Sequence, residues 1–195
     1  RFPTYNPFVF CGVPFLSNIQ TGAFYPVDIV FYFIEPQTAF KITFFINYFI
    51  YLIGCWLLIS FFSGSDHSEE SEIGVIKLFG IIALAFAWFP VYFSPLKQVF
   101  NAYVWIPLIF YHLLKFLVSD NPRYVLYYSI FLGFSILGGH PQYPFYTLFF
   151  SAIIAIAYFI RDTKRLTKSK IAYLAVAIFV IMLITIPQLY PTLEF

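Results

Sequence analysis

Residues 171–186 of the chain read IAYLAVAIFVIMLITI, and this stretch contains no charged side chain. A helix needs about 20 predominantly apolar residues to cross the hydrocarbon core of a bilayer, and this stretch approaches that length. The rest of the chain is similar, because 61% of its 195 residues are hydrophobic and only 10% are charged. A soluble domain carries about 25% charged residues. Lipid must therefore be the solvent for most of this surface.

Six apolar stretches are long enough, or nearly long enough, to span a bilayer: residues 38–62, 73–93, 99–118, 124–138, 144–160 and 171–186. Backbone groups in lipid must be hydrogen-bonded internally, which leaves helices or closed barrels. Barrel strands alternate polar and apolar residues, whereas these stretches are apolar on all sides. The sequence predicts an all-α, polytopic transmembrane helix bundle in one domain. Residues 1–37 are expected to form an outer loop, and residues 38–186 are expected to form six spans. Residues 187–195 are expected to begin the next outer loop.

The fourth and fifth stretches are short, and only a polar turn at residues 139–143 separates them. A helical hairpin that dips into the membrane also fits, but two short spans are the simpler interpretation. Residues 24–34 are too few to span. They are expected to form a short interfacial helix, because they begin with Tyr25-Pro26 and carry Asp28.

The basic residues predict the orientation. The connector at residues 161–170 reads RDTKRLTKSK and holds five of the 11 Lys and Arg residues. Such connectors stay in the cytoplasm, and acidic residues contribute little to topology. The connector is therefore expected in the cytoplasm of a multi-pass cell-membrane protein. The His140 turn and both ends of the chain are expected on the extracytoplasmic side.

The first outer segment is rich in proline, glycine and aromatic residues, which predicts a rigid loop that is neither strand nor helix. Its amide side chains, Asn6, Asn18 and Gln20, stand beside aromatic residues. That mixture suits sugar hydroxyls and ring faces. It equally suits an ordinary loop packed on the membrane surface, and composition leaves both interpretations open.

A second polar segment, Gly138-Gly139-His140-Pro141-Gln142, interrupts two apolar stretches. Helix ends that meet at a membrane boundary often build binding sites. Histidine can donate, accept or titrate near neutrality, so His140 and Gln142 are candidate site residues. A structural role for His140 is an equal alternative.

The C-terminal segment, residues 187–195, carries Glu194 next to its last residue. That carboxylate could bind a divalent metal ion, act as a base, or be a solvated loop residue. Trp105 is interpreted as an interfacial anchor beside a proline kink at Pro107. His112 lies deeper in the same stretch, where a polar residue usually faces the bundle interior.

Several classes of function have no motif in the chain. There is no Gly-rich phosphate loop, no His-Glu-x-x-His motif and no Cys-x-x-Cys pair, and nothing resembles a nucleic-acid surface. Cys11 and Cys55 are interpreted as unpaired. Because the sequence begins with Arg1 rather than Met, it is expected to be a piece of a longer protein.

Taken together, the outer segments resemble the YfhO family of bacterial membrane proteins. The resemblance rests on four motifs in matching order: Pro3-Thr4-Tyr5-Asn6-Pro7 with Gly12-Val13-Pro14-Phe15 and Gln20-Thr21-Gly22-Ala23-Phe24-Tyr25-Pro26, then Trp105-Ile106-Pro107-Leu108, then Gly139-His140-Pro141-Gln142, then Gln188-Leu189-Tyr190-Pro191-Thr192-Leu193-Glu194. Tyr5 stands where the family usually has Trp. The resemblance covers nearly the whole chain.

The resemblance implies a GT-C-like membrane glycosyltransferase. Its donor would be a polyprenyl-phosphate sugar, its acceptor a cell-envelope glycan or glycolipid, and its other partners membrane lipids. His140 and Gln142 would contact phosphate or sugar, Asn6 and Gln20 would position substrate, and Glu194 would bind acceptor or metal. The family's catalytic aspartate is expected upstream of Arg1, and Asp28 does not stand at that position.

Two other functions stay open. A transporter or flippase of lipid-linked glycans would need polar residues along a path through the bilayer, and Lys41, Asn47 and His112 are the main intramembrane polar groups. A non-catalytic membrane scaffold would keep the spans without needing the loop motifs.

Overall fold

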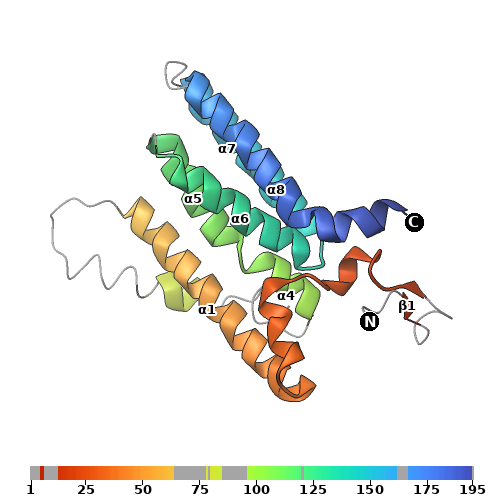
Figure 1. Ribbon diagram of the computed structural model, residues 1–195. Helices are drawn as coiled ribbons and strands as arrows, with labels where there is room; N and C mark the ends of the chain where they lie inside the picture. Colours follow the sequence, from red (N-terminus) through yellow and green to blue (C-terminus); the bar gives the residue numbers. More distant parts are fainter. Residues whose placement is uncertain are drawn as a thin grey trace.

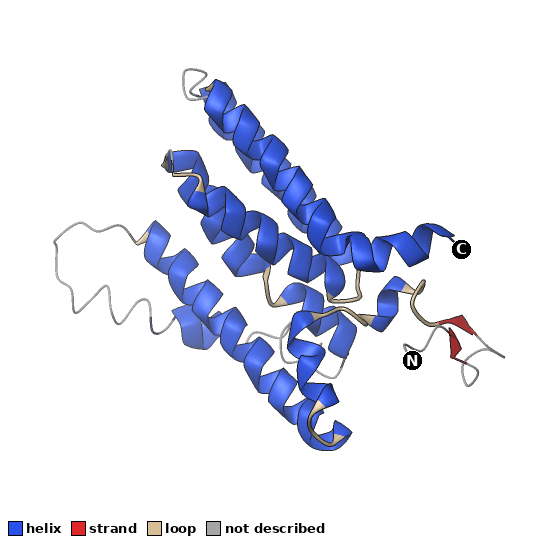
Figure 2. Cartoon of the chain, in the orientation of Figure 1, coloured by secondary structure: helices blue, strands red, loops and turns tan. Residues whose placement is uncertain are grey.

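The computed structural model describes residues 5–6, 13–63, 78, 80–84, 96–119, 121–161 and 167–194, and these are predominantly helical (Figures 1 and 2). The α-helices are α1 (Pro36–Phe62), α4 (Lys97–Tyr103), α5 (Ile106–Val118), α6 (Arg123–Leu137), α7 (Gln142–Arg161) and α8 (Lys168–Glu194). Two 3₁₀ helices, η1 (Ile19–Thr21) and η2 (Pro26–Tyr32), precede them. Residues 80–84 are also helical.

Four of these segments are long and apolar enough to cross a membrane: Pro36–Phe62, Lys97–Val118, Gln142–Arg161 and Lys168–Leu193. The prediction of a helical fold with membrane-spanning segments is confirmed for these four helices. The stretch expected at 124–138 forms α6, whose 15 residues extend only about 22 Å and fall short of a full crossing. The stretch expected at 73–93 lies largely outside the described residues.

Proline and glycine set several helix boundaries. Pro36 begins α1 and Pro107 lies in the first turn of α5, positions where the missing N–H of proline costs nothing. Pro122 precedes α6, and the glycine pair at 138–139 follows it. The predicted turn between α6 and α7 is therefore present, and it joins two helices.

Helix α8 continues beyond its expected end. Residues 187–194 were expected to begin a loop, but they are helical, with Pro187 and Pro191 inside the helix. Figure 1 shows the helix bending over this part. Proline removes a backbone donor and kinks a helix. In the same part of the helix, the hydroxyls of Thr185 and Thr192 donate to the carbonyls of Ile181 and Gln188, each at 2.8 Å.

The N-terminal segment contains more regular structure than its composition suggests. Strand β1 (Tyr5–Asn6) pairs antiparallel with β2 (Val13–Pro14), so the expected absence of strand and helix is wrong there. The predicted short helix at 24–34 is present as η2. The side chains of Ile29 and Tyr32 in η2, and of Phe33 just after it, are exposed.

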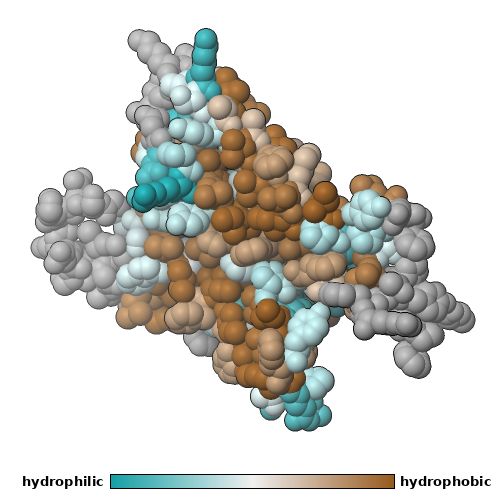
Figure 3. Space-filling view, in the orientation of Figure 1, coloured by the Kyte–Doolittle hydropathy of each residue, from teal (hydrophilic) through white to brown (hydrophobic). Residues whose placement is uncertain are grey.

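The helices pack around α5. Its buried residues Ile109 and Phe116 belong to a core that includes Phe100 of α4 and Leu132 of α6. Helix α1 runs parallel to α5, because Gly54 lies against Leu108 and Phe61 lies near Lys115. Helix α6 runs antiparallel to α5 and packs against α8. Hydrophobic residues cover the middle of the face in Figure 3, and hydrophilic residues gather toward its ends.

Candidate functional site

Three segments that are distant in sequence meet at one end of the bundle. The N-terminal strap, residues 15–25, passes over the turn between α6 and α7, where Gly22 faces the carbonyl oxygens of Leu137 and Gly138. On its other side, the Gln188 side chain of α8 donates to the carbonyl of Leu16 at 2.8 Å. We call this end, with η2 and the start of α4, the loop end (Figure 1).

The glycines of the turn allow a close approach of backbones. A Cβ atom on Gly138 would lie 2.6 Å from the backbone nitrogen of Ala102 and 2.8 Å from the carbonyl carbon of Asn101. Gly139 has a φ of +91°, which favours glycine, and a Cβ there would lie 3.1 Å from the carbonyl oxygen of Gln20. The Gly-Gly pair thus has a structural explanation that does not need a ligand.

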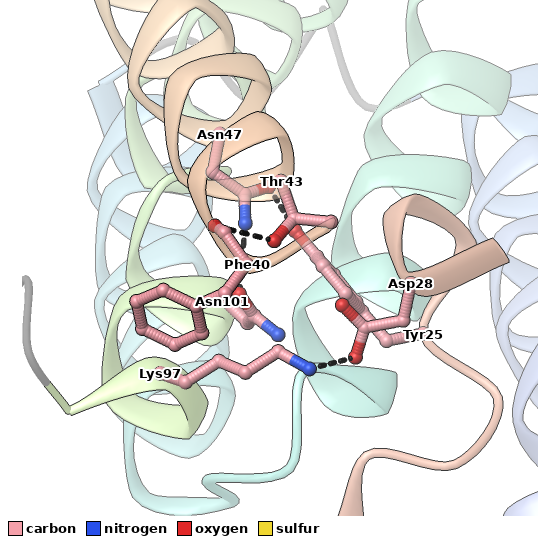
Figure 4. A network of polar contacts seen from close by, with 7 residues as sticks. All are labelled: Tyr25, Asp28, Phe40, Thr43, Asn47, Lys97 and Asn101. Carbon is pink, nitrogen blue, oxygen red and sulfur yellow. Dashed lines mark hydrogen bonds and ion pairs between the residues drawn. The ribbon is translucent and has the colours of Figure 1, made fainter. Parts of the chain in front are cut away.

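A buried network of polar side chains lies beneath the strap. The Tyr25 hydroxyl donates to Asn47 Oδ1 at 2.6 Å and accepts from Trp105 Nε1 at 3.1 Å. Asn47 Nδ2 in turn donates to Asn101 Oδ1 at 2.8 Å. Figure 4 shows Tyr25, at the end of the strap, converging with Asn47 of α1 and Asn101 of α4. A network satisfied in this way fixes the relative positions of its elements.

An ion pair lies next to this network. Lys97 Nζ of α4 contacts Asp28 Oδ2 of η2 at 2.6 Å and also lies 4.2 Å from the centre of the Phe31 ring. The other carboxylate oxygen, Oδ1, is buried and has no hydrogen-bond partner among the described residues. Burial raises the pKa of Asp28, and Lys97 opposes that shift without outweighing it. Burial also raises the pKa of Tyr25.

The two candidate residues of the turn face different surroundings. His140 is half-buried, its ring centre lies 5.1 Å from that of Tyr143, and its Nδ1 atom is buried without a partner among the described residues. Gln142 is exposed and donates to the Tyr146 hydroxyl at 2.8 Å. His140 is therefore the stronger candidate for an inward-facing role.

The other three candidates are placed in less detail. Gln20 is exposed, and its backbone lies against Gly139. Asn6 belongs to β1, and Glu194 is the last residue of α8. The side chains of Asn6 and Glu194 lie outside the described part of the chain. In that described part, no group of three or more His, Cys, Asp or Glu side chains could hold a metal ion.

Sequence reasoning missed the polar network. Trp105 was expected to be an interfacial anchor, but it is 5% exposed and lies against Phe131 and Phe134, with ring centres 5.5 and 5.2 Å away. The available signal was Asn47 and Asn101, two amides within apolar stretches. Polar residues at such depth usually have a partner inside the bundle.

The three intramembrane polar residues have different surroundings in the described part of the bundle. Lys41 is exposed on α1, and Asn47 is bound within the network. His112 Nδ1 lies 2.8 Å from the carbonyl oxygen of Leu108, and its ring contacts Tyr127 and Phe131.

The basic connector begins at the opposite end of the bundle. Lys170, at the start of α8, is buried and donates from Nζ to the carbonyl of Leu117 at 3.1 Å, near the end of α5. Lys115 lies over the Phe61 ring at 5.5 Å. We call this the connector end. His140 and the two flanks of the connector are therefore at opposite ends of the bundle. The side of the membrane that each end faces stays a prediction.

Comparisons of the chain with protein-family models, with curated proteins and with solved structures gave no match. The resemblance to the YfhO family therefore rests on the order and spacing of the sequence motifs. The geometry of the loop end is a separate and independent observation.

Proposed function

We propose that this chain belongs to a membrane glycosyltransferase of the GT-C type, whose site lies at the loop end on the extracytoplasmic side. The donor would be a polyprenyl-phosphate sugar and the acceptor a cell-envelope glycan or glycolipid. A soluble nucleotide-binding domain is not needed, because the leaving group is a lipid phosphate. The basic residues near the connector support this orientation.

In this proposal an acidic base activates the acceptor hydroxyl, and hydrogen-bond donors steady the departing phosphate. His140 supplies such a donor, while Gln142, Gln20 and Asn6 contact or position the sugar. Glu194 binds the acceptor or a metal ion. Asp28 is not assigned as the base, because one of its oxygens is bound by Lys97.

One observation carries the proposal. The strap, the His140 turn and the last part of α8 bear three of the family-like motifs, and they lie side by side although up to 172 positions separate them in the chain. The unpartnered Nδ1 atom of His140 lies in this arrangement. A buried polar atom without a partner costs free energy unless a ligand or water satisfies it.

The proposal is tested by His140→Ala in the intact protein, supplied with a polyprenyl-phosphate sugar and an envelope acceptor. Loss of a donor that stabilises transition-state charge lowers turnover by about 100-fold or more, and we expect a decrease of that order. Glycan transfer would be measured at matched protein levels. The matched control is His67→Ala, which removes a histidine from the acidic segment expected on the cytoplasmic side.

The same preparation separates the two rival functions. Movement of a fluorescent donor lipid across liposomes without sugar transfer would favour a flippase. Neither movement nor transfer, with normal protein levels, would favour a scaffold. Full transfer activity in His140→Ala would remove His140 from the site.

A further inference from the structure

A groove of about 320 Å³ lies between α6 and α8 near the connector end, away from the loop end. Arg123 and Tyr173 lie at its outer part, and Val180 lies at its deep part. Its floor includes two small buried side chains, Ser129 and Ala177. Ser129 Oγ donates to the carbonyl of Val125 at 2.7 Å, so the hydroxyl hydrogen of this serine is already used within α6.

The groove is short relative to the membrane. Along α6 it runs from Arg123 to Ser129, and along α8 from Tyr173 to Val180, which is about 10 Å at the helical rise of 1.5 Å per residue. The hydrocarbon core is about 30 Å thick. The groove therefore matches part of a lipid acyl chain from one leaflet of the membrane. It is too short for a ligand that crosses the bilayer.

The charge at its outer part is positive, and Arg123 has no ion-pair partner among the described residues. Arg123 is exposed, and the one ion pair among the described residues is Lys97 with Asp28, at the other end. Lys170 does not compete for the same role, because its Nζ atom is bound to the carbonyl of Leu117. The nearby connector, residues 161–170, adds further basic residues to this end.

We propose that this groove binds one phospholipid with an anionic headgroup. The phosphate lies against the Arg123 guanidinium, which can bind it through two parallel hydrogen bonds. One acyl chain lies between α6 and α8 over Ser129 and Ala177. Tyr173 lies at headgroup level, where tyrosine is enriched. Basic pockets between transmembrane helices suit anionic headgroups of the cytoplasmic leaflet.

The headgroup contact is tested by native mass spectrometry of the chain in detergent with equal amounts of phosphatidylglycerol and phosphatidylcholine. We expect one phosphatidylglycerol to be retained in preference, and Arg123→Gln to weaken its retention at least fivefold. The matched control is Arg161→Gln, which removes the same charge from the same end but outside the groove. Equal weakening by both variants would indicate diffuse attraction by basic residues and would overturn the site.

The acyl-chain contact is tested separately by filling the groove. Val180→Trp and Val176→Trp place an indole in it, and each should lower phosphatidylglycerol retention at least fivefold. Val176 is exposed, so its variant should fold even if the other does not. Phe179→Trp, on the exposed face of α8, should leave retention unchanged. Unchanged retention in both valine variants, or equal retention of phosphatidylcholine, would overturn the proposal.

Discussion

Different kinds of contact hold the helices together at the two ends of the bundle. At the loop end, backbones touch at Gly138, and Tyr25, Asn47 and Asn101 form a buried hydrogen-bonded chain. At the connector end, a hydrogen bond from Lys170 to the carbonyl of Leu117 joins α8 to α5. Basic side chains there otherwise lie over aromatic rings or in contact with solvent.

The two kinds of contact differ in how strictly they fix the positions of the helices. A buried polar network is stable only when each member keeps its partner, so it specifies one arrangement of its helices. Apolar contacts and long basic side chains accept small shifts more readily. A site that must hold substrate in a fixed geometry is therefore better supported at the loop end. The connector end is suited to contact with lipid headgroups.

The largest loss of stability is expected from Gly138→Ala, at the loop end. Its φ of −61° is acceptable for alanine, so the cost comes from the new methyl group, which would lie 2.6 Å from a backbone nitrogen of α4. Because backbone cannot move aside as a side chain can, we expect a loss of about 3 kcal/mol, at the upper end of overpacking costs. Equilibrium unfolding in mixed detergent micelles would measure it.

The matched control lies toward the connector end. Among the described residues, Gly80→Ala meets the terminal methyl group of Ile59, at 3.2 Å, and that side chain can turn away. We expect a change of less than about 1 kcal/mol, with alanine favoured by helix propensity. Equal losses in both variants would mean that the two ends are packed alike.

A smaller loss is expected from Tyr25→Phe, which removes one hydroxyl from the network. Asn47 Oδ1 and Trp105 Nε1 would both lose a partner while remaining buried. A buried group left without a hydrogen bond costs about 1–3 kcal/mol, so we expect a loss of about 2 kcal/mol in the same unfolding measurement. Tyr32→Phe, on an exposed residue of η2, should have no measurable effect. A neutral Tyr25→Phe would show that the network adds nothing to stability.

The sequence predicted the features that depend on local composition. Apolar length placed α1, α7 and the main part of α8, and the Gly-His-Pro-Gln segment correctly marked a turn between two helices. The apolar length of α7 also places the connector and that turn at opposite ends of one helix. These features follow from the solvent and from the local effects of proline and glycine, so no tertiary information was required.

The parts that could not be predicted depend on contacts between distant residues. Trp105 looks like an interfacial anchor until Tyr25, 80 positions earlier, gives its indole a buried acceptor. Helix α8 continues through Pro187, and Gln188 beyond it contacts Leu16 of the strap, 172 positions away in the chain. For the candidate site, the sequence identified His140 and Gln142 but could not show that they face different environments.

The smallest expected effect is a pH dependence at the ion pair. Burial raises the pKa of Asp28 above its ordinary value of 3.8, so the folded state holds the proton more tightly than the unfolded state. Stability relative to Asp28→Asn should therefore be greatest below that ordinary value and fall as pH rises through the raised pKa. Because Lys97 is 28% exposed and Asp28 14% exposed, solvent screening keeps the change below about 1 kcal/mol.

Lys97→Met sharpens this prediction, because it removes the charge that opposes the shift. In that variant the pKa of Asp28 should rise further, and the loss of stability as pH rises above the ordinary value of 3.8 should be larger. Unfolding would be measured as a function of pH for the parent chain, Asp28→Asn, Lys97→Met and the double variant. If the parent instead gained stability over Asp28→Asn as pH rose, the effect of Lys97 on the pKa of Asp28 would outweigh that of burial. The charged form of Asp28 would then stabilise the contact between η2 and α4.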